Sequence, residues 1–165
     1  MSSTQLNTET APQASGVGTV PMRFEVTTLP VADVDRAKAF YQRLGWRLDI
    51  DFNPTPDTRG VQFTPPGSQA SIHFGHGTTT MTGPLERLLL IVDDIDAARA
   101  DLVSRGVEVS EIFHDVEGVF HHAGDEKRAA GLYPGRRSYG SFASFQDPDG
   151  NGFLLQEVTE RLPGR

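Results

Sequence analysis

The sequence predicts an α+β protein in which two βαβββ modules pair into a curled, cup-like mixed sheet with the helices outside. The first observation is a repeat: VADVDRAKAFYQRLGWRL, from Val31, returns as VDDIDAARADLVSRGVEV, from Val92. The two segments align without a gap, and each contains a glycine at the same position, Gly45 in the first and Gly106 in the second. The second observation is that each copy follows one apolar strand and precedes further strand-like segments. Because a repeat of this kind marks a duplicated structural unit, we expect both copies to fold alike.

Each copy begins with a strand and a helix. The apolar strands are residues 24–29 and 88–92. Asp33 and Asp94 follow, where a side-chain oxygen can accept hydrogen bonds from the free amides of a helix start. Apolar residues then recur at helical spacing: Val34, Ala37, Tyr41 and Leu44 in one copy, and Ile95, Ala98 and Leu102 in the other. The glycine after each pattern fits the left-handed residue that ends a helix.

Three further strands are expected in each copy. They are WRLDID, GVQFTP and ASIHFGH in the first copy, and VEVSEI, GSFASFQ and GFLLQEV in the second. The last two strands are separated by the turn signals PPGS and DPDGN. DPDGNG also resembles the start of a calcium loop, but the closing glutamate, Glu157, comes one place early. We therefore interpret it as a hairpin turn.

The composition limits the class of protein. The 165 residues are 37% hydrophobic and 22% charged, which is typical of a soluble globular protein. The net charge is −7 and is dispersed, which argues against nucleic acid and anionic membranes as partners. No apolar run is long enough to span a bilayer. The absence of cysteine excludes disulfides, thiolate zinc sites and cysteine nucleophiles.

The first residues differ in composition from the rest. Residues 1–21 are rich in Ser, Thr, Gln and Gly and lack the blocks of a secretory signal, so we expect a disordered leader and a cytoplasmic protein. Residues 22–160 form the predicted domain, and residues 161–165 a short tail.

Three segments carry a family resemblance. LPVADVDRAKAFYQRLGW, IVDDIDAARADLVSRG and DPDGNGFLLQE resemble the vicinal oxygen chelate superfamily, which includes glyoxalase I, extradiol dioxygenases and bleomycin resistance proteins. The resemblance covers residues 22–160. It implies module one (22–83), module two (84–160), a cleft that binds a small molecule, and pairing that is compatible with a homodimer. It does not fix the chemistry, because one fold hosts many activities.

The resemblance also implies where metal ligands would lie. The four positions carry Val26, His73, Arg87 and Leu154 in this chain. Valine and leucine have no donor atom, and arginine stays protonated. One imidazole cannot hold zinc, nickel or iron. We therefore predict no cofactor, and no metal at the position that the family uses.

Module two contains an insertion at about residues 113–140. It holds His114, His121 and His122 together with tyrosines and arginines. We consider two interpretations, a lid that closes the cleft and a solvated loop. If a metal is found, the alternative ligand set is His73, His121 and His122, although adjacent histidines on a strand point to opposite faces.

The candidate site residues follow from these positions. His73, His121 and His122 are the candidate catalytic groups, because an imidazole can exchange a proton near neutral pH. Arg87 could anchor an anionic oxygen through its planar donors. Gln156 shares a strand face with Leu154. The candidate substrate-binding residues are Val26, Thr28, Arg87, Leu154, Gln156, Tyr139 and Arg136.

The function predicted from the sequence is to act on or bind a small, partly apolar, oxygenated molecule. Whether the chain is an enzyme stays open, and we favour a metal-independent enzyme of the lyase or isomerase type. The alternative is a non-catalytic resistance protein that sequesters a toxic molecule. The second alternative is a metal-dependent lyase or dioxygenase that uses the relocated histidines.

Overall fold

The computed structural model describes residues 18–118 and 124–163. His121 and His122, and most of the predicted leader, lie outside these ranges. Module one contains β1 (Val26–Thr28), α1 (Val34–Arg43), β2 (Arg47–Thr55), β3 (Thr58–Thr64) and β4 (Ser71–His76). Module two contains β5 (Leu88–Val92), α2 (Ile95–Ser104), β6 (Phe113–Asp115), β7 (Arg128–Ala130), the 3-10 turn η1 (Pro134–Arg136), β8 (Ser141–Gln146) and β9 (Gly152–Glu157).

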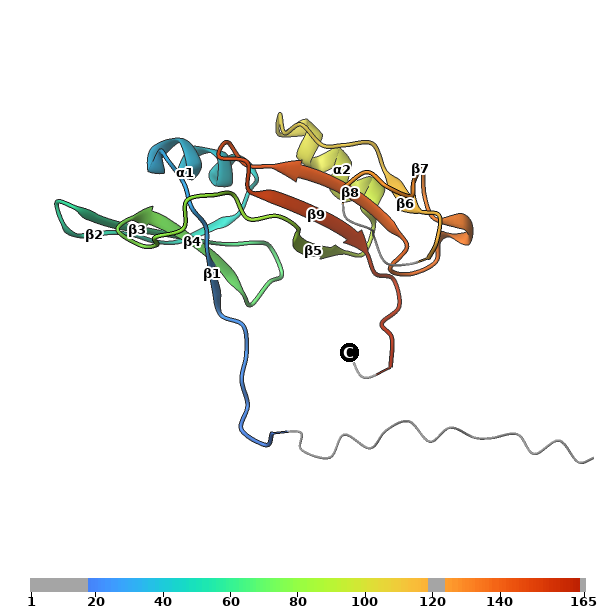
Figure 1. Ribbon diagram of the computed structural model, residues 1–165, viewed down its shortest axis with the longest axis horizontal. Coiled ribbons are helices and arrows are strands. Elements are labelled where there is room, and N and C mark those ends of the chain that lie inside the picture. Colours follow the sequence, from blue (N-terminus) through green and yellow to red (C-terminus); the bar gives the residue numbers. More distant parts are fainter. Residues whose placement is uncertain (1–17, 119–123, 164–165) are drawn as a thin grey trace, which may run out of the picture.

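The two modules have the same strand order. The first sheet runs β1-β4-β3-β2, and the second runs β5-β9-β8-β6 with β7 added at its edge. The first strand of each module pairs parallel to the last, and the other pairs are antiparallel. Both helices lie over one side of the sheets (Figure 1). The predicted α+β fold of two βαβββ modules is confirmed.

The register of the two modules is also the same. Thr28 lies opposite His73 in the β1–β4 pair, and Leu89 lies opposite Leu154 in the β5–β9 pair. Thr28 and Leu89 occupy matching positions of the repeat, so His73 and Leu154 are structural counterparts. The correspondence that the resemblance implies between these two strand positions therefore holds.

The predicted helix caps are confirmed. The side chain of Asp33 accepts a hydrogen bond from the amide of Arg36, and that of Asp94 accepts one from the amide of Ala97. The glycine after each helix, Gly45 or Gly106, has a φ of 78°, the left-handed conformation that glycine adopts without steric cost. No helix among the described residues has the length and apolar character needed to cross a membrane.

Two strand predictions need correction. The segment 107–112 forms no strand; instead β6 begins at Phe113, inside the insertion, and occupies the place that β2 has in module one. Arg99 of α2 donates to the carbonyl of Ser110 at 2.7 Å. A helix side chain therefore occupies a backbone carbonyl that would accept a hydrogen bond from a neighbouring strand if this segment were a strand. The first strand is also shorter than predicted, and Phe24 is 92% exposed.

One aromatic core joins the modules. Tyr41 of α1 contacts the rings of Trp46, Phe74 and, from module two, Phe153. The DPDGN segment is a turn, closed by a hydrogen bond from the amide of Gly150 to the carbonyl of Asp147 at 3.1 Å. Because this turn packs on module one, the β8–β9 hairpin serves to lock the two halves together.

Candidate functional site

Alternating residues of the second sheet face two different environments. Phe153 and Leu155 of β9 pack into the main core under the helices. Leu154, between them, packs with Phe113 and Phe142 in a separate buried cluster on the opposite face. The rings of Phe113 and Phe142 are stacked, with centroids 5.8 Å apart. We call the sheet faces turned away from the helices the open face, and this cluster the aromatic patch.

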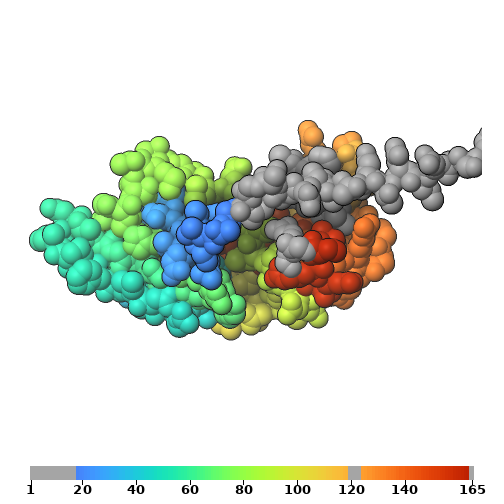
Figure 2. All heavy atoms as spheres, turned by 90° about the horizontal axis from the view of Figure 1, so that it is seen from below, coloured from blue at the N-terminus to red at the C-terminus, as the bar shows by residue number. Residues whose placement is uncertain are grey.

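Apolar side chains continue the open face beyond the aromatic patch. Leu89 and Ile91 of β5 are 52% and 40% exposed, whereas Leu88 and Leu90, which alternate with them, pack against the main core. Figure 2 shows the molecule from this side, where residue 18 onward (blue) and the last described residues (red) also lie. The open face of module two therefore exposes the apolar side chains of β5 beside the aromatic patch, which is itself buried.

The open face of module one is more polar. His73 lies on β4 opposite Gln62, while Ile72 and Phe74 enter the main core. The imidazole covers Gly60 on β3, where an added Cβ would lie 2.9 Å from Nε2 of His73. Burial lowers the pKa of His73, which favours the neutral form of the ring. A neutral imidazole can accept or donate a hydrogen bond on this face.

Two buried hydroxyl groups, of Ser71 and Thr64, lie on this side of the sheet, and sequence reasoning missed them. Ser71 is two residues from His73 on the same strand and so shares its face. Its Oγ lies 2.7 Å from Oγ1 of Thr64, which donates to the carboxylate of Asp49. The bonds from Thr64 and then Arg47 lower the pKa of Asp49. The spacing from His73 was the signal that could have identified Ser71.

Arg87 lies just before β5 rather than on it. Its φ of 61° is left-handed, which is uncommon for a residue with a side chain and marks backbone strain. The sequence predicted a regular strand position matching Val26, which is 44% exposed at the start of β1. Arg87 lines a broad cavity of about 1020 Å³ together with Leu154. It therefore shares a cavity with Leu154, although the strand does not extend to it; His73, Val26, Thr28 and Gln156 do not line this cavity.

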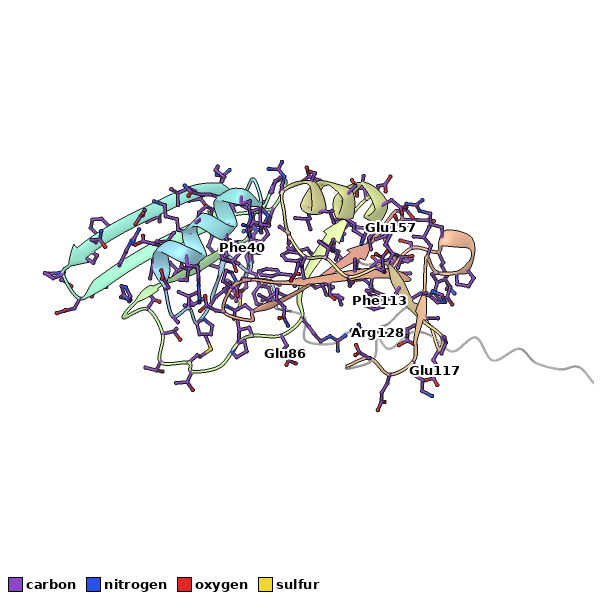
Figure 3. The ribbon with its side chains drawn as sticks, turned by 90° about the horizontal axis from the view of Figure 1, so that it is seen from above. Phe40, Glu86, Phe113, Glu117, Arg128 and Glu157 are labelled. Carbon is purple, nitrogen blue, oxygen red and sulfur yellow. The ribbon has the colours of Figure 1, made fainter. Side chains whose placement is uncertain are left out.

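Arg128 lies at the same cavity, and sequence reasoning did not identify it. Its guanidinium carbon is 4.1 Å from the centroid of the Phe113 ring. Figure 3 shows Phe113, Arg128 and Glu86 on one side of β8 and β9, while Phe40 and Glu157 lie toward the helices. No local pattern marks Arg128, because its position depends on how β7 pairs within the insertion.

Arg136 and Tyr139 are engaged elsewhere. Arg136 donates to both carboxylate oxygens of buried Glu157, at 2.9 and 2.7 Å, on the helix side of the sheet. Tyr139 has a φ of 70°, and its carbonyl accepts a 2.8 Å hydrogen bond from Gln156. The structure therefore brings Gln156 close to Leu154 but does not bring Arg136 to His73.

The chain was compared with known protein families. The model of the Glyoxalase/Bleomycin resistance protein/Dioxygenase superfamily matches residues 23–155. The chain belongs to this superfamily. The comparison with curated proteins gave no match.

Solved structures of the superfamily are similar to this chain. TnmS3, an antibiotic binding protein from Streptomyces sp. CB03234, is 31% identical with a TM-score of 0.59, over 86% of this chain and 99% of its own. A glyoxalase/bleomycin resistance protein from the same Streptomyces is 32% identical with a TM-score of 0.55, over 82% and 100%. A superfamily member from Sphaerobacter thermophilus DSM 20745 is 27% identical with a TM-score of 0.59, over 83% and 98%.

The residues present do not fit the metal of glyoxalase-type relatives. Of the four positions taken from the resemblance, only His73 has a donor for a divalent ion. Among residues 18–118 and 124–163, no group of three His, Cys, Asp or Glu side chains is placed to hold an ion. The alternative set of His73, His121 and His122 stays a prediction, since two of its members lie outside the described residues.

Proposed function

We propose that the protein binds and holds a small, partly apolar, oxygenated molecule on its open face, in the manner of a resistance protein and without the superfamily metal. The observation that carries the proposal is the exposure of two apolar side chains of the open face, Leu89 and Ile91, where Leu89 pairs with Leu154 at the cavity. An apolar surface with a few polar groups at its border is typical of small-molecule sites. The similarity to TnmS3, by its name an antibiotic binding protein, supports the same conclusion.

A neutral fluorescent probe tests this proposal. N-phenylnaphthylamine should bind the wild-type chain saturably. Leu89→Glu places a charge on the apolar open face and should weaken binding on the order of tenfold. Val103→Glu is the matched control, because Val103 is similarly exposed, at 46%, but lies on α2. Absence of saturable binding, or equal loss in both variants, would contradict the proposal.

A metal-independent enzyme is the second candidate, and the neutral imidazole of His73 favours it. A neutral imidazole can take a proton from a bound substrate. Incubation with the hemithioacetal of methylglyoxal and glutathione, without metal, tests this activity. His73→Gln should abolish conversion and leave binding of the neutral probe unchanged. If the wild-type chain returns the hemithioacetal unaltered, glyoxalase-type activity is excluded.

A homodimer is part of the same proposal. β1 is an outer strand of the first sheet and presents Val26, which is 44% exposed. A second copy that covers β1 would remove this apolar surface from water and leave Leu89 and Ile91 open to a ligand. Light scattering at micromolar concentration should give twice the mass of one chain, and a monomer would contradict this.

A further inference from the structure

The residues before β1 continue that strand past the end of its neighbour. β4 begins at Ser71, whose amide donates to the carbonyl of Glu25 at 2.8 Å. The residues before Glu25 therefore extend beyond β4, and Figure 1 shows them (blue) running away from the sheets. We call residues 20–28, which comprise this extension and β1, the edge segment. Its outer half is free to pair with another strand.

Apolar side chains recur at every second position of the edge segment. Val20, Met22, Phe24 and Val26 are 72%, 89%, 92% and 44% exposed. In an extended chain such positions share one face. Val26 lies opposite Ser71 in the β1–β4 pair, so this is the open face of module one. A strand edge that carries a row of exposed apolar side chains is a template for pairing with another chain.

The backbone of the edge segment has its free groups at the even-numbered residues. The carbonyl of Glu25 and the amide of Leu29 both form hydrogen bonds to β4. Backbone groups of successive residues point to opposite edges of a strand. Those of the even-numbered residues therefore point to the outer edge of β1, which is the end of the first sheet. Pro21, which has no amide hydrogen, is odd-numbered and does not interrupt this edge.

The charges of the edge segment favour one register with a second copy. Two identical strands related by a twofold axis pair antiparallel. With Phe24 opposite Phe24 of the second copy, even-numbered residues meet even-numbered residues, and Met22 lies opposite Val26. Arg23 then lies opposite Glu25 of the second copy, at two symmetric places. An axis one residue earlier or later would place Arg23 opposite Arg23 or Glu25 opposite Glu25, and like charges directly opposite each other are destabilising.

We propose that the edge segment pairs antiparallel with the edge segment of a second copy, centred on Phe24. The exposed apolar side chains of the two copies lie side by side on one face, and two pairs of Arg23 with Glu25 form on the other. The first sheets of the two chains thereby become one continuous sheet. This inference rests on the homodimer of the proposed function, because it names the segment and the register of that contact.

Charge exchange tests the register in the full chain. Arg23→Glu replaces two attractive pairs by two repulsive ones, and Glu25→Arg does the same. Each variant should raise the dissociation constant of the dimer on the order of tenfold. The double variant Arg23→Glu, Glu25→Arg restores opposite charges and should return the constant to within about threefold of wild type. Arg161→Glu, in the exposed C-terminal segment, changes the net charge as Arg23→Glu does and is the control. Sedimentation equilibrium measures each constant.

Single thiols test the same register by distance. The chain has no cysteine, so an introduced thiol can form a disulfide only with its own copy. In Phe24→Cys the two Cα atoms should lie about 5.5 Å apart, within the range of a disulfide. In Met22→Cys or Val26→Cys they should lie four residues apart along the strands, roughly 14 Å. Mild oxidation should therefore crosslink Phe24→Cys about tenfold faster than either of the others.

The outcomes separate this inference from the proposed function. If the wild-type chain is a dimer that neither single charge variant weakens, the dimer forms elsewhere, and the inference is overturned while the homodimer stands. If the double variant stays as weak as the single variants, or if Met22→Cys crosslinks as fast as Phe24→Cys, the register is wrong and the inference is overturned. A monomeric wild-type chain overturns both the inference and the homodimer, whereas binding of the neutral probe decides the ligand site separately.

Discussion

Tyr41 donates a 2.7 Å hydrogen bond to Asp147, and this bond connects the helix of module one to the β8–β9 turn of module two. Asn151 donates to the same carboxylate oxygen at 2.8 Å and to the carbonyl of Pro30 at 3.0 Å. Burial, followed by the charge of Asp147, raises the pKa of Tyr41, so the phenol stays a neutral donor. The two modules are therefore held together by a buried polar contact in addition to the aromatic core.

Removal of the Tyr41 hydroxyl should weaken this connection. Tyr41→Phe keeps the ring but leaves the Asp147 carboxylate with one partner fewer, so we expect a loss of about 1–2 kcal/mol in the free energy of unfolding. Urea denaturation measures the change. Tyr133→Phe is the control, because the hydroxyl of Tyr133 makes no hydrogen bond within the described residues. Equal stability of the two variants would mean that the Tyr41 bond contributes nothing.

A methyl group at Gly60 should displace His73. The added Cβ would lie 2.9 Å from Nε2, so the imidazole must turn away toward solvent. As the ring becomes more exposed, its pKa should rise toward the ordinary value of 6.5. An NMR titration of the imidazole measures this shift in Gly60→Ala. Gly83→Ala, where an added Cβ meets nothing within 4 Å, should leave the titration unchanged.

Burial of His73 also predicts a pH dependence of stability. The folded-state pKa lies below the unfolded value of 6.5, so the unfolded chain takes up the proton first. Stability therefore decreases as the pH falls through the unfolded pKa and levels off below the folded pKa. His73→Gln should remove this part of the slope in unfolding measurements between about pH 7.5 and pH 5.5. His76→Gln, at the exposed end of β4, should retain it.

The contact between Arg136 and Glu157 should stabilise the helix side of module two. Glu157 also accepts a 2.9 Å hydrogen bond from the amide of Ile95, at the start of α2. The hydrogen bond from Arg136 is the main reason that the pKa of Glu157 is lowered. Arg136→Ala should therefore reduce the free energy of unfolding, since it leaves a buried carboxylate without its cation.

Two measurements distinguish a structural role of Arg136 from the ligand contact predicted from the sequence. Because the folded-state pKa of Glu157 is lowered, its contribution is present above the unfolded value of 4.5 and is lost at lower pH, so the difference from wild type should shrink in acid. Binding of the neutral probe should stay unchanged. Arg137→Ala, one residue further, is the control. Weaker probe binding at full stability would instead support a ligand contact.

Added divalent metal ions should not bind to the protein stoichiometrically. Three of the four family positions carry side chains that cannot bind a divalent ion, so dialysis against nickel, zinc or iron(II) should leave no stoichiometric metal by elemental analysis. One ion held per chain would contradict this. A His121→Gln, His122→Gln double variant would then show whether the alternative histidine set binds it.

The repeat in the sequence predicted most of the fold. Helix caps and apolar spacing are local signals, and both helices begin after the aspartates that mark them. The β6–β7 pair depends on contacts between residues distant in the sequence. No local pattern therefore indicated that Phe113 and Arg128 would lie next to each other. Similarly, nothing near Arg136 in the sequence indicated that Glu157 would bind it. His73 could be placed because the family resemblance implied its strand position, and the shared register shows that it corresponds to Leu154.

The position of β6 and β7 inside the insertion matters for anyone who shortens or exchanges this segment between homologues. Residues 113–140 do not form a detachable loop, because their first strand pairs with β8 and supplies Phe113 to the aromatic patch. Deletion of the whole segment would expose Phe142 and Leu154 to water and favour aggregation. A chimera that keeps Phe113–Asp115 and Arg128–Ala130, and changes only the residues between them, would preserve the β6–β7 pair and its contact with β8.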